Sequence, residues 1–179
     1  MTDQTKALPT RVETPTAQPW FASRAPARPR TFPLIMSTCA SVAALVLLVA
    51  VGKLLDETVL IPPLAASMAL VAGASTTPLA QPRNVVGGQL ISALVGFAAA
   101  WIGGVGVWSG AVAGGVALGA MLLARVGHSP AAATAVIVAM TQPPFWRFMA
   151  LLALAVLILV AVGLAAGRIG KYRYPVYWW

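Results

Sequence analysis

The sequence predicts an all-α integral membrane bundle, and three observations lead to that prediction. Hydrophobic residues make up 59% of the 179 residues and charged residues only 9%, whereas about a quarter of the residues in soluble domains are charged. The charges gather at the two ends of the chain and in short connections, so that long segments carry none. Proline-rich turns divide these segments into about four full spans and two short helices.

The basic surplus and the scarcity of reactive side chains exclude several classes of function. The net charge of +8 is explained by membrane topology and by contact with the headgroups of a lipid bilayer. No basic stripe marks a folded face, so no nucleic-acid partner is expected. One cysteine and one histidine form no cluster of metal ligands or catalytic groups, and we expect neither a cofactor nor an enzymatic activity.

The chain begins with a polar tail and a first span. Residues 1–33 contain six prolines and no helical or strand period, which predicts a disordered basic tail. Residues 34–52 form the first predicted span. Asp56 and Glu57 follow in a short connection, where adjacent side chains point apart. We therefore interpret them as a solvated, non-cytoplasmic loop and not as a catalytic pair.

A short helix and two spans follow. Pro62 and Pro63 start a short helix that ends in a proline-punctuated turn containing Arg83. Spans are predicted at 85–102 and 107–124, with a glycine-rich hinge between Trp101 and Trp108. Small residues recur along both spans, and such spacing lets helix backbones approach closely. They are Gly87, Gly88, Gly110, Gly114, Gly115 and Gly119.

A second short helix precedes the last span. Ser129 can cap it and Pro130 can take its first position, while Gln142 and two prolines end it. This apolar run is too short for a full span, which needs about 20 residues. Residues 148–167 form the final predicted span, and the basic, aromatic tail at 169–179 is expected to anchor at the cytoplasmic membrane interface.

The order of elements suggests a repeat. Residues 63–67 (PLAAS) are similar to residues 130–134 (PAAAT), and each short helix lies between two spans. Two three-element units, 34–102 and 107–168, would insert in opposite orientations, as in the inverted repeats of secondary transporters. The positive charges then place both termini in the cytoplasm, in a bacterial inner membrane, with Arg147 as the exception.

The amino-terminal ends of the two short helices are the candidate site. Each would offer free backbone N–H groups and the positive end of a helix dipole, which together favour an anion. No predicted span holds a carboxylate, as a cation pathway usually would. The candidate substrate-binding residues are Pro63, Ala65, Ala66, Ser67, Arg83, Asn84, His128, Ser129, Pro130, Ala132, Ala133 and Thr134.

Structural roles for these residues stay open at this point. His128 could donate to the anion, accept a proton or simply hydrogen-bond a loop. The hydroxyls of Ser67 and Thr134 could bind the anion or only back-bond to their own helices. Arg83 could be a topology charge.

Two motifs resemble a known family. Residues 79–88 are LAQPRNVVGG, which resembles the P-x-A-Q-P-R-N-[VI]-[IV]-G-G signature of the HPP transmembrane family. Residues 128–135 are HSPAAATA, which resembles that family's H-P-P-A-G-A-T-A motif but departs from it at Ser129 and Ala132. The resemblance covers about 34–168. It implies a small integral membrane protein, and chloroplast and cyanobacterial members are associated with nitrite transport.

The sequence thus leads to one functional expectation and one alternative. We expect a transporter or channel-like facilitator of a small inorganic anion, with nitrite as the first candidate. The alternative is a non-transporting scaffold or partner subunit that uses its glycine-rich faces to bind other helices. In either case a homo-oligomer is expected, because short helices need cover from lipid.

Overall fold

The computed structural model describes residues 27–178, in which helices are joined by short connections and no β-strand occurs. The prediction of an all-α bundle is confirmed. The predicted disorder of residues 1–26 lies outside the described residues, but the tail is shorter than expected because the first helix already begins at Thr31. The elements are α1 (Thr31–Leu55), α2 (Pro62–Gly73), η1 (Pro78–Ala80), α3 (Pro82–Gly103), α4 (Val107–Leu123), α5 (Ala131–Thr141) and α6 (Phe145–Gly170).

Among the described residues, three helices, not four, are long enough to span a membrane. They are α1, α3 and α6, with 25, 22 and 26 residues. The helix α4 has 17 residues, or about 26 Å of length, which is less than the roughly 30 Å of a bilayer's hydrocarbon core. It ends early because the chain turns at Arg125, whose φ of 58° is left-handed. The short helices α2 and α5 begin within one residue of their predicted starts.

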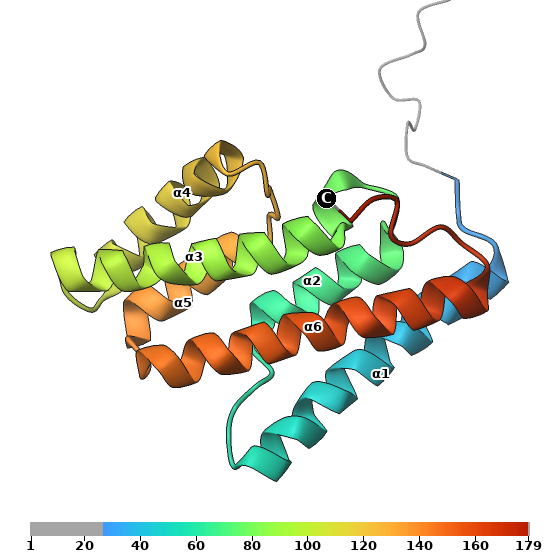
Figure 1. Ribbon diagram of the computed structural model, residues 1–179, viewed down its shortest axis with the longest axis horizontal. Helices are drawn as coiled ribbons and strands as arrows, with labels where there is room; N and C mark the ends of the chain where they lie inside the picture. Colours follow the sequence, from blue (N-terminus) through green and yellow to red (C-terminus); the bar gives the residue numbers. More distant parts are fainter. Residues whose placement is uncertain (1–26, 179) are drawn as a thin grey trace, which may run out of the picture.

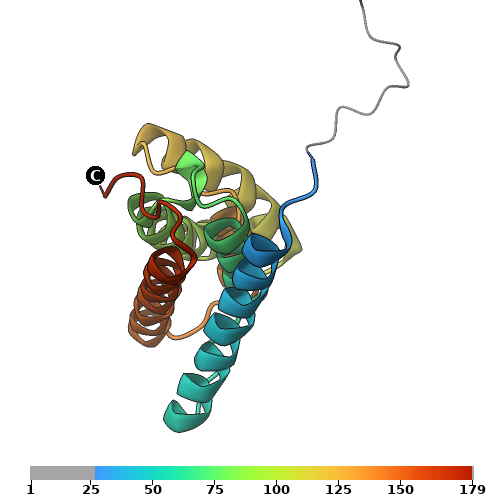
Figure 2. The same cartoon turned by 90° about the vertical axis from the view of Figure 1, so that its right-hand side faces the viewer.

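Successive helices alternate in direction along the bundle (Figure 1). The first described residues and the carboxyl terminus therefore lie toward the same end. The helix α1 forms one edge of the bundle, and its carboxyl-terminal end extends beyond the other helices in both views (Figures 1 and 2).

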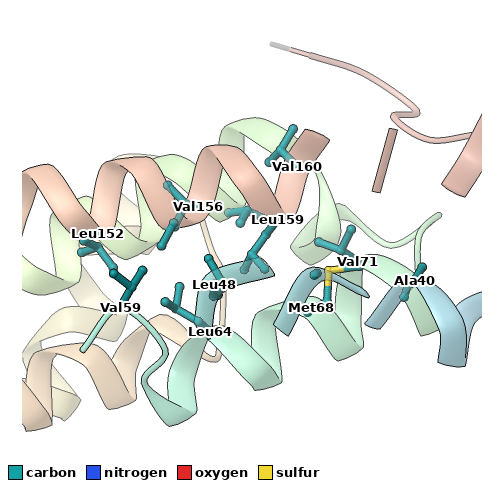
Figure 3. Packing of buried hydrophobic residues seen from close by; sticks show 14 of the residues in the cluster. Ala40, Leu48, Val59, Leu64, Met68, Val71, Leu152, Val156, Leu159 and Val160 are labelled. Atoms are coloured by element: carbon teal, nitrogen blue, oxygen red, sulfur yellow. The ribbon is translucent and has the colours of Figure 1, made fainter. Parts of the chain in front are cut away.

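Large apolar side chains fill the layer between α1, α2 and α6. Leu48, Leu64, Met68 and Leu159 are fully buried and converge there (Figure 3). Lipid tails are as apolar as these side chains, so the packing of helix on helix, and not exclusion of water, stabilises this layer.

Small residues replace large ones where α3, α4 and α5 pack together. A methyl group at Gly96 of α3 would lie 2.6 Å from the carbonyl oxygen of Ala135, and one at Gly114 of α4 would lie 2.9 Å from Val136. The predicted close packing is thus confirmed for several of the glycines. It is wrong for Gly115 and Gly119, which face outward with nothing within 4 Å.

Arg147, the exception to the predicted distribution of positive charges, forms an ion pair. Its guanidinium Nη2 contacts Glu57 Oε1, so the cation at the start of α6 meets the carboxylate of the α1–α2 connection. We had expected Glu57 to be only a solvated loop residue, and this ion pair corrects that expectation. The pair leaves this end of the bundle without the uncompensated charge that Arg147 alone would bring.

The carboxyl-terminal tail folds back onto the protein. Tyr174 is 7% exposed and packs against Gly163 of α6, while the Val176 N–H donates to Gln81 Oε1 at 2.7 Å. The prediction of an aromatic anchor in the membrane interface is therefore wrong for Tyr174. Trp178 remains more than half exposed.

Candidate functional site: a buried polar cluster between the short helices

The amino-terminal ends of α2 and α5 approach each other inside the bundle. The two helices are in contact, and in Figure 1 they extend in opposite directions from its middle. The N–H groups of residues 131–133 already donate to the carbonyls of residues 128–130, at 3.0 to 3.3 Å. The backbone donors that we expected to be free at α5 are therefore engaged, and side chains become the main polar groups at this place.

Ser129 does not cap α5. The helix begins at Ala131, Pro130 occupies the capping position, and no side chain makes a cap hydrogen bond. Ser129 is exposed. The predicted cap is wrong because the backbone carbonyls of the connection, including that of Ser129, satisfy the first turn instead.

Four polar side chains from separate elements form what we call the polar cluster: Ser67 of α2, Gln89 of α3, His128 of the α4–α5 connection and Thr134 of α5. Each is at most 1% exposed. Gln89 Nε2 donates to Ser67 Oγ at 2.9 Å, and Thr134 Oγ1 donates to Gln89 Oε1 at 2.5 Å. Ser67 Oγ lies 2.7 Å from His128 Nε2. The cluster therefore links both short helices and the histidine in one chain of hydrogen bonds.

The direction of these hydrogen bonds follows from one carbonyl. His128 Nδ1 lies 2.7 Å from the carbonyl oxygen of Leu79, which can only accept, so Nδ1 carries a proton. Burial favours the neutral imidazole, and Nε2 must then accept. Ser67 consequently donates to His128, and its oxygen accepts from Gln89. This order also fixes the orientation of the Gln89 amide, which geometry alone leaves ambiguous.

Ser92 adds a buried hydroxyl beside the cluster. It is fully buried, and its Oγ has no hydrogen-bond partner. Three residues beyond Gln89 on α3, it lies on the same face of the helix. Since buried polar groups are nearly always paired, an unpaired hydroxyl at this position is consistent with a bound polar ligand.

Two of the other predicted site residues, Pro63 and Asn84, hydrogen-bond near the polar cluster, and Arg83 lies farther along α3. The Pro63 carbonyl lies 2.8 Å from Ser67 Oγ, and Asn84 Nδ2 donates to the Gly127 carbonyl at 3.0 Å, which ties α3 to the connection that carries His128. Arg83 lies six residues before Gln89 on α3, or about 9 Å along the axis.

The alanines of the two motifs do not contribute equally. Ala65 and Ala132 are half-buried, whereas Ala66 and Ala133 are exposed on the outer faces of their helices. The side chains of Ala66 and Ala133 therefore lie outside the polar cluster, against our expectation. The helical period places them there, one residue before Ser67 and Thr134.

Gln89 is the functional candidate that sequence reasoning missed. It lies in an otherwise largely apolar helix, Pro82–Gly103, and an intramembrane polar side chain is a site candidate by default. That signal was available. The prediction concentrated on the ends of the short helices and overlooked the long helix α3, whose Gln89 side chain reaches both of them.

Comparison with known proteins agrees with the motifs. The family profile described as HPP, transmembrane region, matches residues 26–175. Two proteins of Dictyostelium discoideum, both named as transmembrane proteins, are similar to the chain. The first is 35% identical over 130 residues, 68% of this chain and 46% of its own length. The second is 33% identical over 124 residues, 64% of this chain and 40% of its own length.

The chain thus spans less than half the length of these two relatives. No solved structure matches it. Both sequence motifs, at 79–88 and 128–135, fall inside the family match, which also covers every helix of the bundle. The chain belongs to the HPP transmembrane-region family.

Proposed function

We propose that this protein is a transmembrane transporter or channel-like facilitator of a small inorganic anion, with nitrite as the first candidate. The observation that carries the proposal is the polar cluster. It joins Ser67 to Thr134 through Gln89, where the amino-terminal halves of the two short helices meet. A membrane bundle rarely buries so many polar groups without a functional reason.

The chemistry of the cluster favours an anion. Hydroxyl and amide groups can turn their hydrogens toward a guest, and the positive ends of the α2 and α5 dipoles point toward the same place. None of the described helices contains Asp or Glu. A cation pathway would usually include a carboxylate within its spans.

An inverted repeat would explain why the two short helices meet. Residues 64–68 and 131–135 share one order of burial: buried, half-buried, exposed, buried, buried. The packing also corresponds between the units, since α2 contacts α1 and α6 while α5 contacts α4 and α3. These correspondences support the two proposed units, 34–102 and 107–168, related by an axis in the membrane plane.

We also propose a bacterial inner membrane with both termini in the cytoplasm, and the charges support this orientation. Cations lie at the start of α1 and α3 and at the end of α4 and α6, on the side of the termini. The opposite side has Lys53 and the paired Arg147. An excess of Lys and Arg marks the cytoplasmic side. The residues on the side of the termini are Arg28, Arg30, Arg83, Arg125, Arg168, Lys171 and Arg173.

A homo-oligomer is part of the proposal. An apolar groove of about 450 Å³ lies between α3 and α4, lined by residues such as Val95, Ala99 and Val112. A second copy could cover this groove. Native mass spectrometry in detergent tests this, and a strictly monomeric protein would exclude it.

Uptake into proteoliposomes tests the transport proposal. We expect flux of nitrite, with nitrate, formate and chloride compared at equal concentration. Thr134→Val should lower nitrite uptake about tenfold, because a hydrogen bond to a charged group contributes roughly 1.5–3 kcal/mol. Thr141→Val is the matched control, since Thr141 is exposed and bonds only to its own helix.

Two results would count against transport. Folded wild-type protein that carries none of these anions would refute it, and would favour a scaffold or partner subunit. Equal uptake by Thr134→Val and Thr141→Val would remove Thr134 from the anion site.

A further inference from the structure

We propose that His128 takes up one proton when the anion binds, so that the anion and a proton occupy and cross the bundle together. This inference rests on the proposed function. It is carried by the geometry around Ser67, which lies within hydrogen-bond distance of two different acceptors.

The Ser67 hydroxyl can form a hydrogen bond with His128 in either protonation state of the imidazole. In the neutral state it donates to His128 Nε2 at 2.7 Å. When Nε2 gains a proton it becomes a donor, and the Ser67 hydrogen can turn to the Pro63 carbonyl, which lies 2.8 Å away. One N–H bond forms, one O–H rotates, and no heavy atom has to move. The proton comes from water on either side of the membrane.

Protonation is opposed by burial, because the residues that the structure describes place no carboxylate around His128. The elements α2, η1, α4 and α5 contain no Asp, Glu, Lys, Arg, Tyr or Cys. The helix α3 contributes Arg83, and the α4–α5 connection contributes Arg125. The tail, which reaches Gln81 beside η1, adds Lys171, Tyr172, Arg173, Tyr174 and Tyr177. Among the described groups around His128, none is a carboxylate.

An anion in the polar cluster would supply the missing charge. An imidazolium buried with only cations near it is costly, and the same imidazolium beside an anion is stabilised by a direct Coulomb interaction. By reciprocity, protonation of His128 strengthens anion binding as much as the anion strengthens protonation. The bound pair is neutral, which suits passage through an apolar bundle.

Proton uptake on binding is the direct test. Sodium nitrite is added to the full chain in detergent, in weak buffer near pH 7 with a pH indicator, and sodium gluconate serves as the ionic-strength control. We expect about one proton taken up per nitrite bound. The dissociation constant should fall about tenfold for each unit of pH decrease while free His128 is neutral.

The variant His128→Gln keeps a polar side chain but cannot take the proton. It should lose both the proton uptake and the pH dependence of nitrite affinity. Thermal unfolding shows whether the variant folds. If it does not fold, proton uptake by the wild-type protein tests the proposal. In proteoliposomes, wild-type nitrite uptake should follow an imposed pH gradient and be insensitive to a potassium-valinomycin potential.

The outcomes separate the two proposals. Nitrite that binds and crosses without proton uptake, with flux that follows the membrane potential, would overturn the coupling and leave anion transport intact. A wild-type protein that neither binds nor carries any tested anion would overturn both. Unchanged proton uptake in folded His128→Gln would assign the proton to another group and overturn the role of His128.

Discussion

Gln89 of α3 accepts a hydrogen bond of 2.5 Å from Thr134 of α5 inside the bundle. The same amide donates to Ser67 of α2, so one side chain on a spanning helix holds both short helices together. Removal of that amide would leave the buried Thr134 hydroxyl without its acceptor, and the Ser67 oxygen would lose its donor. Buried polar groups that lose their partners cost roughly 1–3 kcal/mol each.

Gln89→Leu should therefore destabilise the protein although it makes the core more apolar. We expect a loss of about 1–3 kcal/mol, measured as a lower thermal unfolding midpoint in detergent. The loss should shrink when Thr134→Val is present, because the two side chains share one hydrogen bond. Strict additivity in this double-mutant cycle would mean that the Gln89–Thr134 bond contributes nothing to stability.

The sequence predicted the helices better than their contacts. Prolines and glycines are local signals, and they located both short helices and the hinge between Trp101 and Trp108. Membrane helices are apolar on all sides, so periodicity does not identify their buried face. This is why Ala66 and Ala133 were assigned to a site that they do not face. In the sequence, only the repeat suggested that Ser67 and Thr134 lie near each other.

Long-range packing explains the remaining differences. Nothing in the local sequence indicates that Arg147 meets Glu57, because their contact joins segments far apart in the chain. The aromatic tail was predicted from composition, which does not distinguish burial in lipid from burial on protein. Tyr174 is buried on the protein.

Gly88 keeps His128 in place, and an added methyl group there should disturb the site. A Cβ at Gly88 would lie 2.6 Å from His128 Cβ and 3.1 Å from the Val126 carbonyl oxygen. We expect Gly88→Ala to lower nitrite uptake severalfold and to destabilise the protein by about 1–3 kcal/mol.

Gly115→Ala is the matched control for Gly88→Ala. It lies on α4 with nothing within 4 Å, and alanine is better than glycine in a helix by about 1 kcal/mol. This variant should keep or raise the unfolding midpoint. Equal effects of the two substitutions would show that helix propensity, and not the contact with His128, governs position 88.

The Arg147–Glu57 pair should contribute little to stability but should prefer opposite charges. The Arg147 side chain is 61% exposed, and exposed pairs contribute about 0–1 kcal/mol. Glu57→Arg alone should lower the unfolding midpoint through like-charge repulsion. The double variant Glu57→Arg, Arg147→Glu should recover most of that loss, and a double variant less stable than both single variants would argue against the ion pair.

Tyr174 should stabilise the tail through its ring and not through its hydroxyl. The ring packs against Gly163, whereas the hydroxyl is buried without a hydrogen-bond partner. Tyr174→Phe should therefore be neutral or slightly stabilising, because it removes an unpaired polar group. Tyr174→Ala should cost about 3 kcal/mol through the cavity it leaves. A larger loss in Tyr174→Phe than in Tyr174→Ala would contradict this assignment.

The same phenol should give the tail a dependence on alkaline pH. Burial raises the pKa of Tyr174 above its ordinary value, so the folded state holds this proton more tightly than the unfolded state. The contribution of Tyr174 to stability is then fully present below about pH 10 and decreases above it. Ultraviolet titration of tyrosinate should show a late-ionising phenol in the wild type that is missing in Tyr174→Phe. If the phenol that Tyr174→Phe removes instead ionises near pH 10, it is in contact with water, and the packed position of the tail is excluded.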